Sequence, residues 1–132
     1  VLATLHTPDA PQTIERIIDV FPPHQQQQIR QQLAACLQGV ISQKLLPRSD
    51  GKGRVLATEI MVATPAIRNL IREQAVEQMV TSIQTGAQFG MKTMDRSLKE
   101  LLEAGLISYE TAVDHAKNTQ EFAFLLKNKR SV

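Results

Sequence analysis

The strongest local signal in this sequence is a β-hairpin. Two segments rich in β-branched residues, Val40–Leu46 and Arg54–Val62, follow one another closely. The connection Pro47–Gly53 contains the dipeptide Asp50-Gly51, which is typical of a tight turn between antiparallel strands. Helical periodicity dominates the sequence on both sides, so we expect these two strands to pair with each other.

Two helices are expected before the hairpin. The first begins at Asp9, with Gln12 as its capping-box partner, and ends at Pro22-Pro23. The second covers about residues 24–38. Its apolar residues, which we expect to face the core, are Ile29, Leu33, Cys36 and Leu37.

The first residues, Val1–Leu5, have the composition of a buried strand. A strand that is apolar on both faces needs sheet neighbours, and the sequence offers few nearby. We therefore interpret the start of the chain as a cut through a larger fold. His6 would then stand just beyond the carboxyl end of a strand, where open α/β sheets place groups that face a ligand.

Helices are predicted for the whole chain after the hairpin. Thr64 and Pro65 have the character of an N-cap followed by proline at the first helical position. Later apolar stripes fall in 76–83 and 94–102, Ser108 caps a short helix, and Asn118 begins a last one. In that last helix Glu121 is the expected capping partner and Phe122, Leu125 and Leu126 the inward residues. The expected layout is an α/β portion in residues 1–62 and an α-helical portion in residues 63–132.

The composition of the 132 residues favours one globular domain, with 42% apolar residues and a formal net charge of +2. No dense run of Lys and Arg indicates nucleic-acid binding, and we expect Lys127, Lys129 and Arg130 to form a solvated tail. The single Cys36 excludes an intrachain disulfide and fits a reducing compartment. No segment is long and apolar enough to predict a membrane span, so a cytoplasmic location is expected.

Few residues carry an obvious chemistry. Gly51-Lys52-Gly53 lacks the earlier glycine and the following Ser or Thr of a phosphate-binding loop. His24 and His115 stand alone, without a second ligand at metal-binding spacing, so no metal site is predicted. The remaining candidates are His6 and the polar face of the helix after Thr64, on which Arg68 and Arg72 stand one turn apart.

Several segments together resemble a known family. The segment Ala66–Glu73, called the motor-helix segment below, reads AIRNLIRE. Leu2–Thr7 is similar to the second half of a His box. Gly39–Pro47, Ser82–Gly86 and Gly90–Asp95 continue the similarity. On these motifs the chain resembles the PilT-type pilus-retraction (twitching motility) ATPases of the type II/IV secretion ATPase family, over essentially its whole length. The sequence lacks the CxxC insertion usual in the pilus-extension and type II secretion branches, which favours the retraction branch.

The resemblance implies the C-terminal part of a RecA-like P-loop ATPase core followed by a helical bundle. It implies a homo-hexameric motor that hydrolyses ATP with Mg²⁺ and acts with platform components at the inner-membrane base of a type IV pilus. This chain alone would be inactive, because it contains no P-loop and no acidic boxes. His6 would sense the nucleotide with Thr7 beside it, and Arg30 and Gln43 are weaker candidates for polar contacts. Coupling of hydrolysis to retraction would fall to Ala66, Ile67, Arg68, Asn69, Leu70, Ile71, Arg72 and Glu73.

Two alternatives remain open at the level of sequence. The chain could be a non-enzymatic helical interaction module whose contact surface is the polar face of the motor-helix segment. It could also be part of a pilus-extension or type II secretion ATPase. Replacement of His6 distinguishes the motor from the interaction module, because it would abolish ATP turnover in a motor and leave a binding module untouched.

Overall fold

A computed structural model describes residues 1–130, apart from the side chains of residues 121, 125 and 127–130. Within it the chain forms two compact units. The first contains Val1–Ser42 and Glu59–Lys92, and the second contains Gln43–Thr58 and the chain from Thr93 onward. The roles predicted for the side chains of Glu121, Leu125, Lys127, Lys129 and Arg130 lie outside the described part. The predicted division at residue 62 concerns a longer parent protein and stays a prediction.

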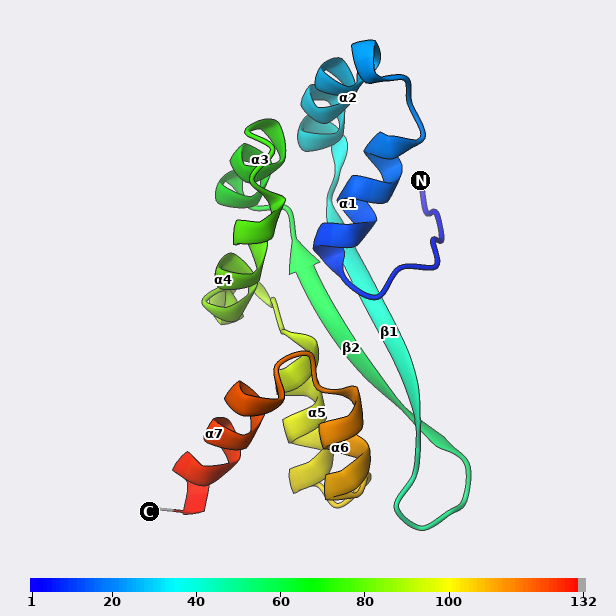
Figure 1. The fold of residues 1–132 in the computed structure, drawn as a ribbon, viewed down its shortest axis with the longest axis vertical. Helices are drawn as coiled ribbons and strands as arrows, with labels where there is room; N and C mark the ends of the chain where they lie inside the picture. The colour runs from blue at the N-terminus through cyan, green and yellow to red at the C-terminus, as the bar shows by residue number, and fades with distance from the viewer. Residues whose placement is uncertain (131–132) are drawn as a thin grey trace. The chain divides into compact units, whose positions relative to one another are not determined.

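The hairpin is present as predicted, with β1 (Gly39–Pro47) and β2 (Arg54–Val62) paired side by side (Figure 1). Asp50 begins its turn by accepting a hydrogen bond from the Lys52 backbone N–H at 2.8 Å. That bond is the main cause that lowers the pKa of Asp50. Gly51 and Gly53 follow with φ of 75° and 88°, values that glycine adopts without steric cost.

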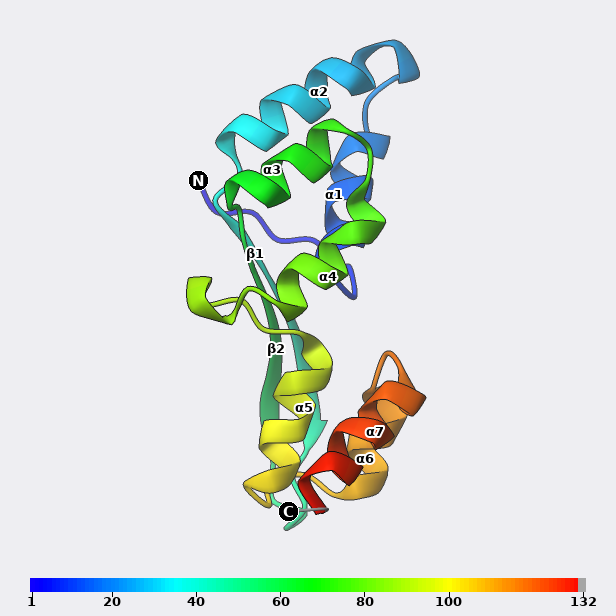
Figure 2. The ribbon, with the colours of Figure 1, turned by 90° about the vertical axis from the view of Figure 1, so that its left-hand side faces the viewer.

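The first unit packs four α-helices onto its end of the hairpin: α1 (Ala10–Asp19), α2 (Pro23–Cys36), α3 (Pro65–Arg72) and α4 (Met79–Gln84). Short 3₁₀ turns, Val76–Gln78 and Ala87–Phe89, precede and follow α4. Helices α2 and α3 lie side by side in both views (Figures 1 and 2). The core of this unit contains Ile14, Ile18, Ala34, Met61, Ile67, Ile71 and Met79. Two backbone hydrogen bonds between Ile60 and Lys92, of 2.8 and 3.0 Å, attach the last residue of this unit to β2.

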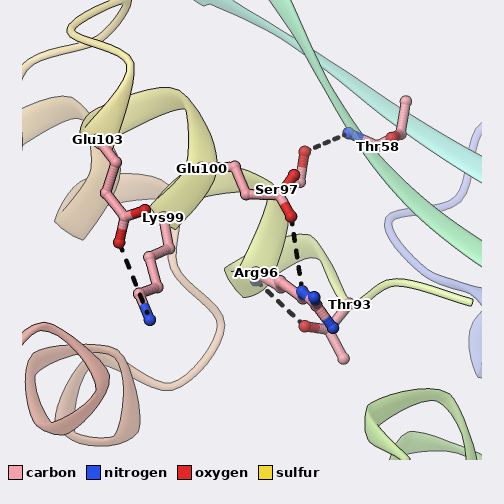
Figure 3. A network of polar contacts seen from close by, with 7 residues as sticks. All are labelled: Thr58, Thr93, Arg96, Ser97, Lys99, Glu100 and Glu103. Atoms are coloured by element: carbon pink, nitrogen blue, oxygen red, sulfur yellow. Dashed lines mark hydrogen bonds and ion pairs between the residues drawn. The ribbon is translucent and has the colours of Figure 1, made fainter. Parts of the chain in front are cut away.

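The second unit packs α5 (Met94–Glu103), α6 (Tyr109–His115) and α7 (Thr119–Arg130) with the turn end of the hairpin. Its core contains Leu46, Ala57, Met94, Leu98, Ile107, Ala112 and Phe122. Ser97 Oγ accepts a 3.1 Å hydrogen bond from the Thr58 backbone N–H, which joins α5 to β2 (Figure 3). Two ion pairs along α5 lie at its surface in the same view, Arg96–Glu100 and Lys99–Glu103, where solvent screens such contacts.

The strand predicted at Val1–Leu5 is absent. Residues 1–7 form no regular secondary structure, and every side chain from Val1 to His6 is exposed. The sheet described here contains only β1 and β2, so the segment has no strand beside it. A strand depends on its pairing partners, and the apolar composition of this segment could not reveal that residues 1–130 supply none.

The prediction that Cys36 lies in the core is also wrong. Helix α2 buries Arg30 and Ala34, while Leu33 and Leu37 are half-buried and Cys36 is exposed. The other predicted inward residues, Ile29, Leu33 and Leu37, do pack against the core, and the residues that α2 buries most deeply are Ala34 and Arg30. Position 36 lies about 200° around the helix from position 34.

Among residues 1–130, no helix is both long enough and apolar enough to span a membrane.

Candidate functional site

His6 borders an open pocket of about 310 Å³ at the start of α1. Thr7 lies beside it, and the first turns of α1 supply Gln12, Glu15 and Arg16. An imidazole, a hydroxyl, an amide and a guanidinium can all donate hydrogen bonds to an anion such as a phosphate. The carboxylates of Glu15 and Asp19 lie on the same rim, so the pocket has both signs of charge.

The segment that carries His6 is attached to α1 by hydrogen bonds. Thr7 Oγ1 lies 2.6 Å from Thr13 Oγ1, and Thr13 Oγ1 donates to the Asp9 carbonyl oxygen at 2.8 Å. Asp9 caps the helix, because its Oδ1 accepts from the Gln12 backbone N–H at 2.8 Å. His6 is therefore positioned by a helix start, and not by the end of a strand as the sequence suggested.

Arg30 and Gln43 occupy different environments. Arg30 is only 7% exposed and its Nη1 lies 3.5 Å from Glu15 Oε1, so it reaches the pocket rim through Glu15 and does not line the pocket itself. Its Nε has no hydrogen-bond partner among the described residues. Gln43 is an exposed residue of β1 and belongs to the second unit. A nucleotide contact by either residue stays a prediction.

The motor-helix segment folds as predicted. Thr64 Oγ1 accepts a hydrogen bond from the Ile67 backbone N–H, Pro65 is the first helical residue, and α3 ends at Arg72. Ile67 and Ile71 are fully buried and hold the helix on the core of the first unit. The signature is thus an amphipathic helix with a firmly packed apolar face.

The charged residues of the motor-helix segment divide into two groups. Arg68 points to α2, where its Nη1 donates to the carbonyl oxygens of Ala34 and Ala35 at 2.6 and 3.2 Å. Asn69, Arg72 and Glu73 are exposed, and Asn69 Nδ2 donates to Glu73 Oε1 at 3.3 Å. Only the second group, Asn69, Arg72 and Glu73, is available to a partner, and these three residues are called the outward triad below.

Arg68 therefore caps the C-terminus of α2. A cation close to the last carbonyls of a helix satisfies hydrogen-bond acceptors and interacts favourably with the helix dipole. We expect Arg68→Ala to lower the free energy of unfolding by about 1.5–3 kcal/mol, the range for hydrogen bonds that involve a charged group. Arg72→Ala, on the same helix but exposed, is the matched control and should change it by less than about 0.5 kcal/mol. Urea denaturation measures both, and equal effects would contradict the capping role.

Sequence reasoning missed Glu59 as a residue with a role of its own. Its carboxylate is 4% exposed and lies at the start of α1, where Oε1 accepts from the Ala10 backbone N–H at 2.9 Å. The available signal was its position in β2, between the inward-facing Ala57 and Met61. A carboxylate at an inward position of an apolar strand face needs a buried partner.

Comparisons with known proteins agree with the resemblance, although no protein-family model matches the chain. The chain is 52% identical over 122 residues to the type IV pilus retraction ATPase PilT of Pseudomonas aeruginosa, covering 92% of this chain and 35% of that protein. It is 47% identical to the twitching motility protein of Neisseria gonorrhoeae, over 94% of this chain and 33% of the relative. It is 36% identical to the type IV pilus ATPase PilU of Pseudomonas aeruginosa, over 96% and 33%.

Solved structures show the same relation. The pilus retraction motor PilT with bound ADP superposes with a TM-score of 0.77 at 44% identity, covering 89% of this chain and 32% of that one. The Legionella pneumophila ATPase DotB superposes with a TM-score of 0.66 at 21% identity over 81% of this chain, which shows a shared fold alone.

The fold thus matches part of the pilus retraction motor PilT, which confirms the predicted fold class, the C-terminal part of a RecA-like ATPase core. By sequence, the chain is a homologue of the PilT-type pilus-retraction ATPases. It spans about a third of the length of the curated relatives it matches.

Proposed function

We propose that this chain is part of a hexameric ATPase motor that retracts type IV pili from the cytoplasmic side of the inner membrane. The observation that carries the proposal is the combination of the outward triad on a packed α3 with the PilT similarity over nearly the whole chain. The parent would bind ATP and Mg²⁺ and act with platform components of the pilus. The chain itself shows no feature of a nucleic-acid binder.

In this proposal the residues of the first unit divide the work. His6 senses the nucleotide, and Thr7 and the α1 residues around the pocket supply hydrogen-bond donors for phosphate oxygens. The sequence contains no G-x-x-x-x-G-K-S/T phosphate-loop motif, so the groups that hold Mg²⁺ would belong to other parts of the parent. The 132-residue chain by itself is then expected to hydrolyse no ATP.

The outward triad is the proposed coupling surface. Exposed charges on a rigid helix can form and break ion pairs with a neighbouring subunit or a platform protein, and such pairs determine partner choice and register. The residues of the outward triad lie on α3 or directly after it. The residues of the His6 pocket, by contrast, belong to the segment before α1 and to α1 itself. Coupling and ATP hydrolysis should therefore respond to different substitutions.

We expect the double variant Arg72→Ala, Glu73→Ala in the parent to abolish pilus retraction while ATP turnover stays within about threefold of the wild type. The reason is that both side chains are exposed and absent from the pocket. Surface motility of cells that carry the variant as their only copy measures retraction, and steady-state phosphate release measures turnover. Gln78→Ala, an exposed change elsewhere in the first unit, is the control.

Loss of both activities in the double variant would contradict a separate coupling role. Normal retraction would remove the outward triad from the mechanism. A parent that neither binds nor hydrolyses ATP would leave the non-enzymatic interaction module as the function of this chain.

A further inference from the structure

Glu59 joins the middle of β2 to the start of α1. It is 49 residues away from Ala10 in sequence, yet its Oε1 lies 2.9 Å from the Ala10 backbone nitrogen. Both residues are buried, with Ala10 at 0% and Glu59 at 4% exposure. A buried carboxylate at this place satisfies an N–H of the first helical turn and adds a negative charge at the positive end of the helix dipole.

The start of α1 is also where the His6 segment is attached. Asp9, directly before Ala10, caps the helix through the Gln12 N–H, and its carbonyl accepts from the Thr13 hydroxyl. That hydroxyl in turn bonds to Thr7, the neighbour of His6. A displacement of the first turn of α1 would therefore move Thr7 and His6 with it.

The other end of the connection is firmly fixed. The residue after Glu59, Ile60, forms backbone hydrogen bonds in both directions with Lys92, and Met61, the next inward residue on the strand, is 1% exposed. Glu59 thus projects from a strand position that is held by backbone pairing and by core packing.

We propose that Glu59 is a positioning residue, which holds the start of α1 and thereby sets where His6 and Thr7 stand relative to a bound nucleotide. The inference rests on the proposed ATPase function. Glu59 does not line the His6 pocket, and it acts on the pocket through the acceptor oxygen that it offers to the Ala10 N–H. The expected signature is a lower kcat with little change in KM for ATP, because a small misplacement of a sensing group affects the reacting geometry more than binding.

The test compares Glu59→Met, which has no strong acceptor, with Glu59→Gln, which has similar volume and keeps an oxygen for the Ala10 N–H. Both are made in the full-length parent, with Glu77→Gln, an exposed carboxylate of the same unit, as the control. We expect kcat to fall about 10-fold or more in Glu59→Met and to stay within about 3-fold of the wild type in Glu59→Gln. Deuterium uptake by the peptide spanning residues 8–16 should accelerate about 10-fold in Glu59→Met only.

Several results would overturn the inference. Wild-type kcat in Glu59→Met with His6→Ala inactive would refute the positioning role and leave the proposed function intact. Equal losses in Glu59→Met and Glu59→Gln would show that the acceptor oxygen is not what matters. Normal ATP turnover in His6→Ala would refute the nucleotide-sensing role of His6. Unchanged deuterium uptake in Glu59→Met would separately refute the anchoring of α1 by Glu59. Should Glu59→Met fail to fold, a loss in Glu59→Gln as large as that in His6→Ala refutes the inference.

Discussion

Replacement of His6 by alanine in a full-length ATPase that carries this sequence is expected to lower kcat about 100-fold, the usual effect of removing one aligned hydrogen-bond donor from a reacting charged group. His6 lines the pocket together with Thr7 and with residues of α1 that could donate to phosphate oxygens. Steady-state phosphate release, with nucleotide affinity measured separately, checks this expectation.

His24→Ala is the matched control for this experiment. His24 is an exposed histidine at the start of α2 and does not line the pocket, so its loss should leave kcat unchanged. His6→Asn, which keeps a hydrogen-bond donor at a similar reach, should recover part of the activity. Equal turnover in His6→Ala and the wild type would remove His6 from the mechanism.

The second large effect concerns stability. Ile71→Ala should lower the free energy of unfolding by about 2–5 kcal/mol, the range for truncating a buried isoleucine to alanine. Ile71 is 0% exposed in the core of the first unit. Because a domain of this kind is stable by only about 5–15 kcal/mol in total, this single change would remove a large part of its stability.

Thermal or urea denaturation measures the effect of Ile71→Ala, with Val80→Ala as control. Val80 is 46% exposed, and its truncation should cost less than about 0.5 kcal/mol. A loss below about 1 kcal/mol in Ile71→Ala would contradict the close packing of α3. The result also guides the test of the proposed coupling role, because substitutions on the apolar face of α3 would unfold the unit and could not report on coupling.

The hairpin and the motor helix could be read from the sequence because local rules determine them. Arg54–Val62 and the Thr64 cap have the predicted bounds, and the turn has the predicted chemistry. The strand at Val1–Leu5 could not be judged in the same way, since a strand depends on partners far away in sequence. The resemblance predicts that His6 belongs to a nucleotide site, and this stays a prediction.

The partners of individual charged residues could not be predicted. Arg68 and Arg72 have the same spacing pattern and the same chemistry, yet one caps α2 and the other is exposed. The difference depends on two backbone carbonyls more than thirty residues earlier, and only the packing of α2 against α3 brings them close. Glu59 was missed for the same reason, because its partner is a backbone N–H in a helix that precedes the hairpin.

The residue after the motor-helix segment fixes how far α3 extends. Gln74 has a φ of 58°, in the left-handed region that ordinary residues rarely adopt, and its side chain donates to Gln27 Oε1 at 3.3 Å. Helix α3 therefore ends at Arg72. It cannot gain another turn without changing the backbone conformation of Gln74 and breaking its hydrogen bond to Gln27. If the parent assembles as the ring proposed above, every copy would therefore present Arg72 and Glu73 at the same point along the helix axis.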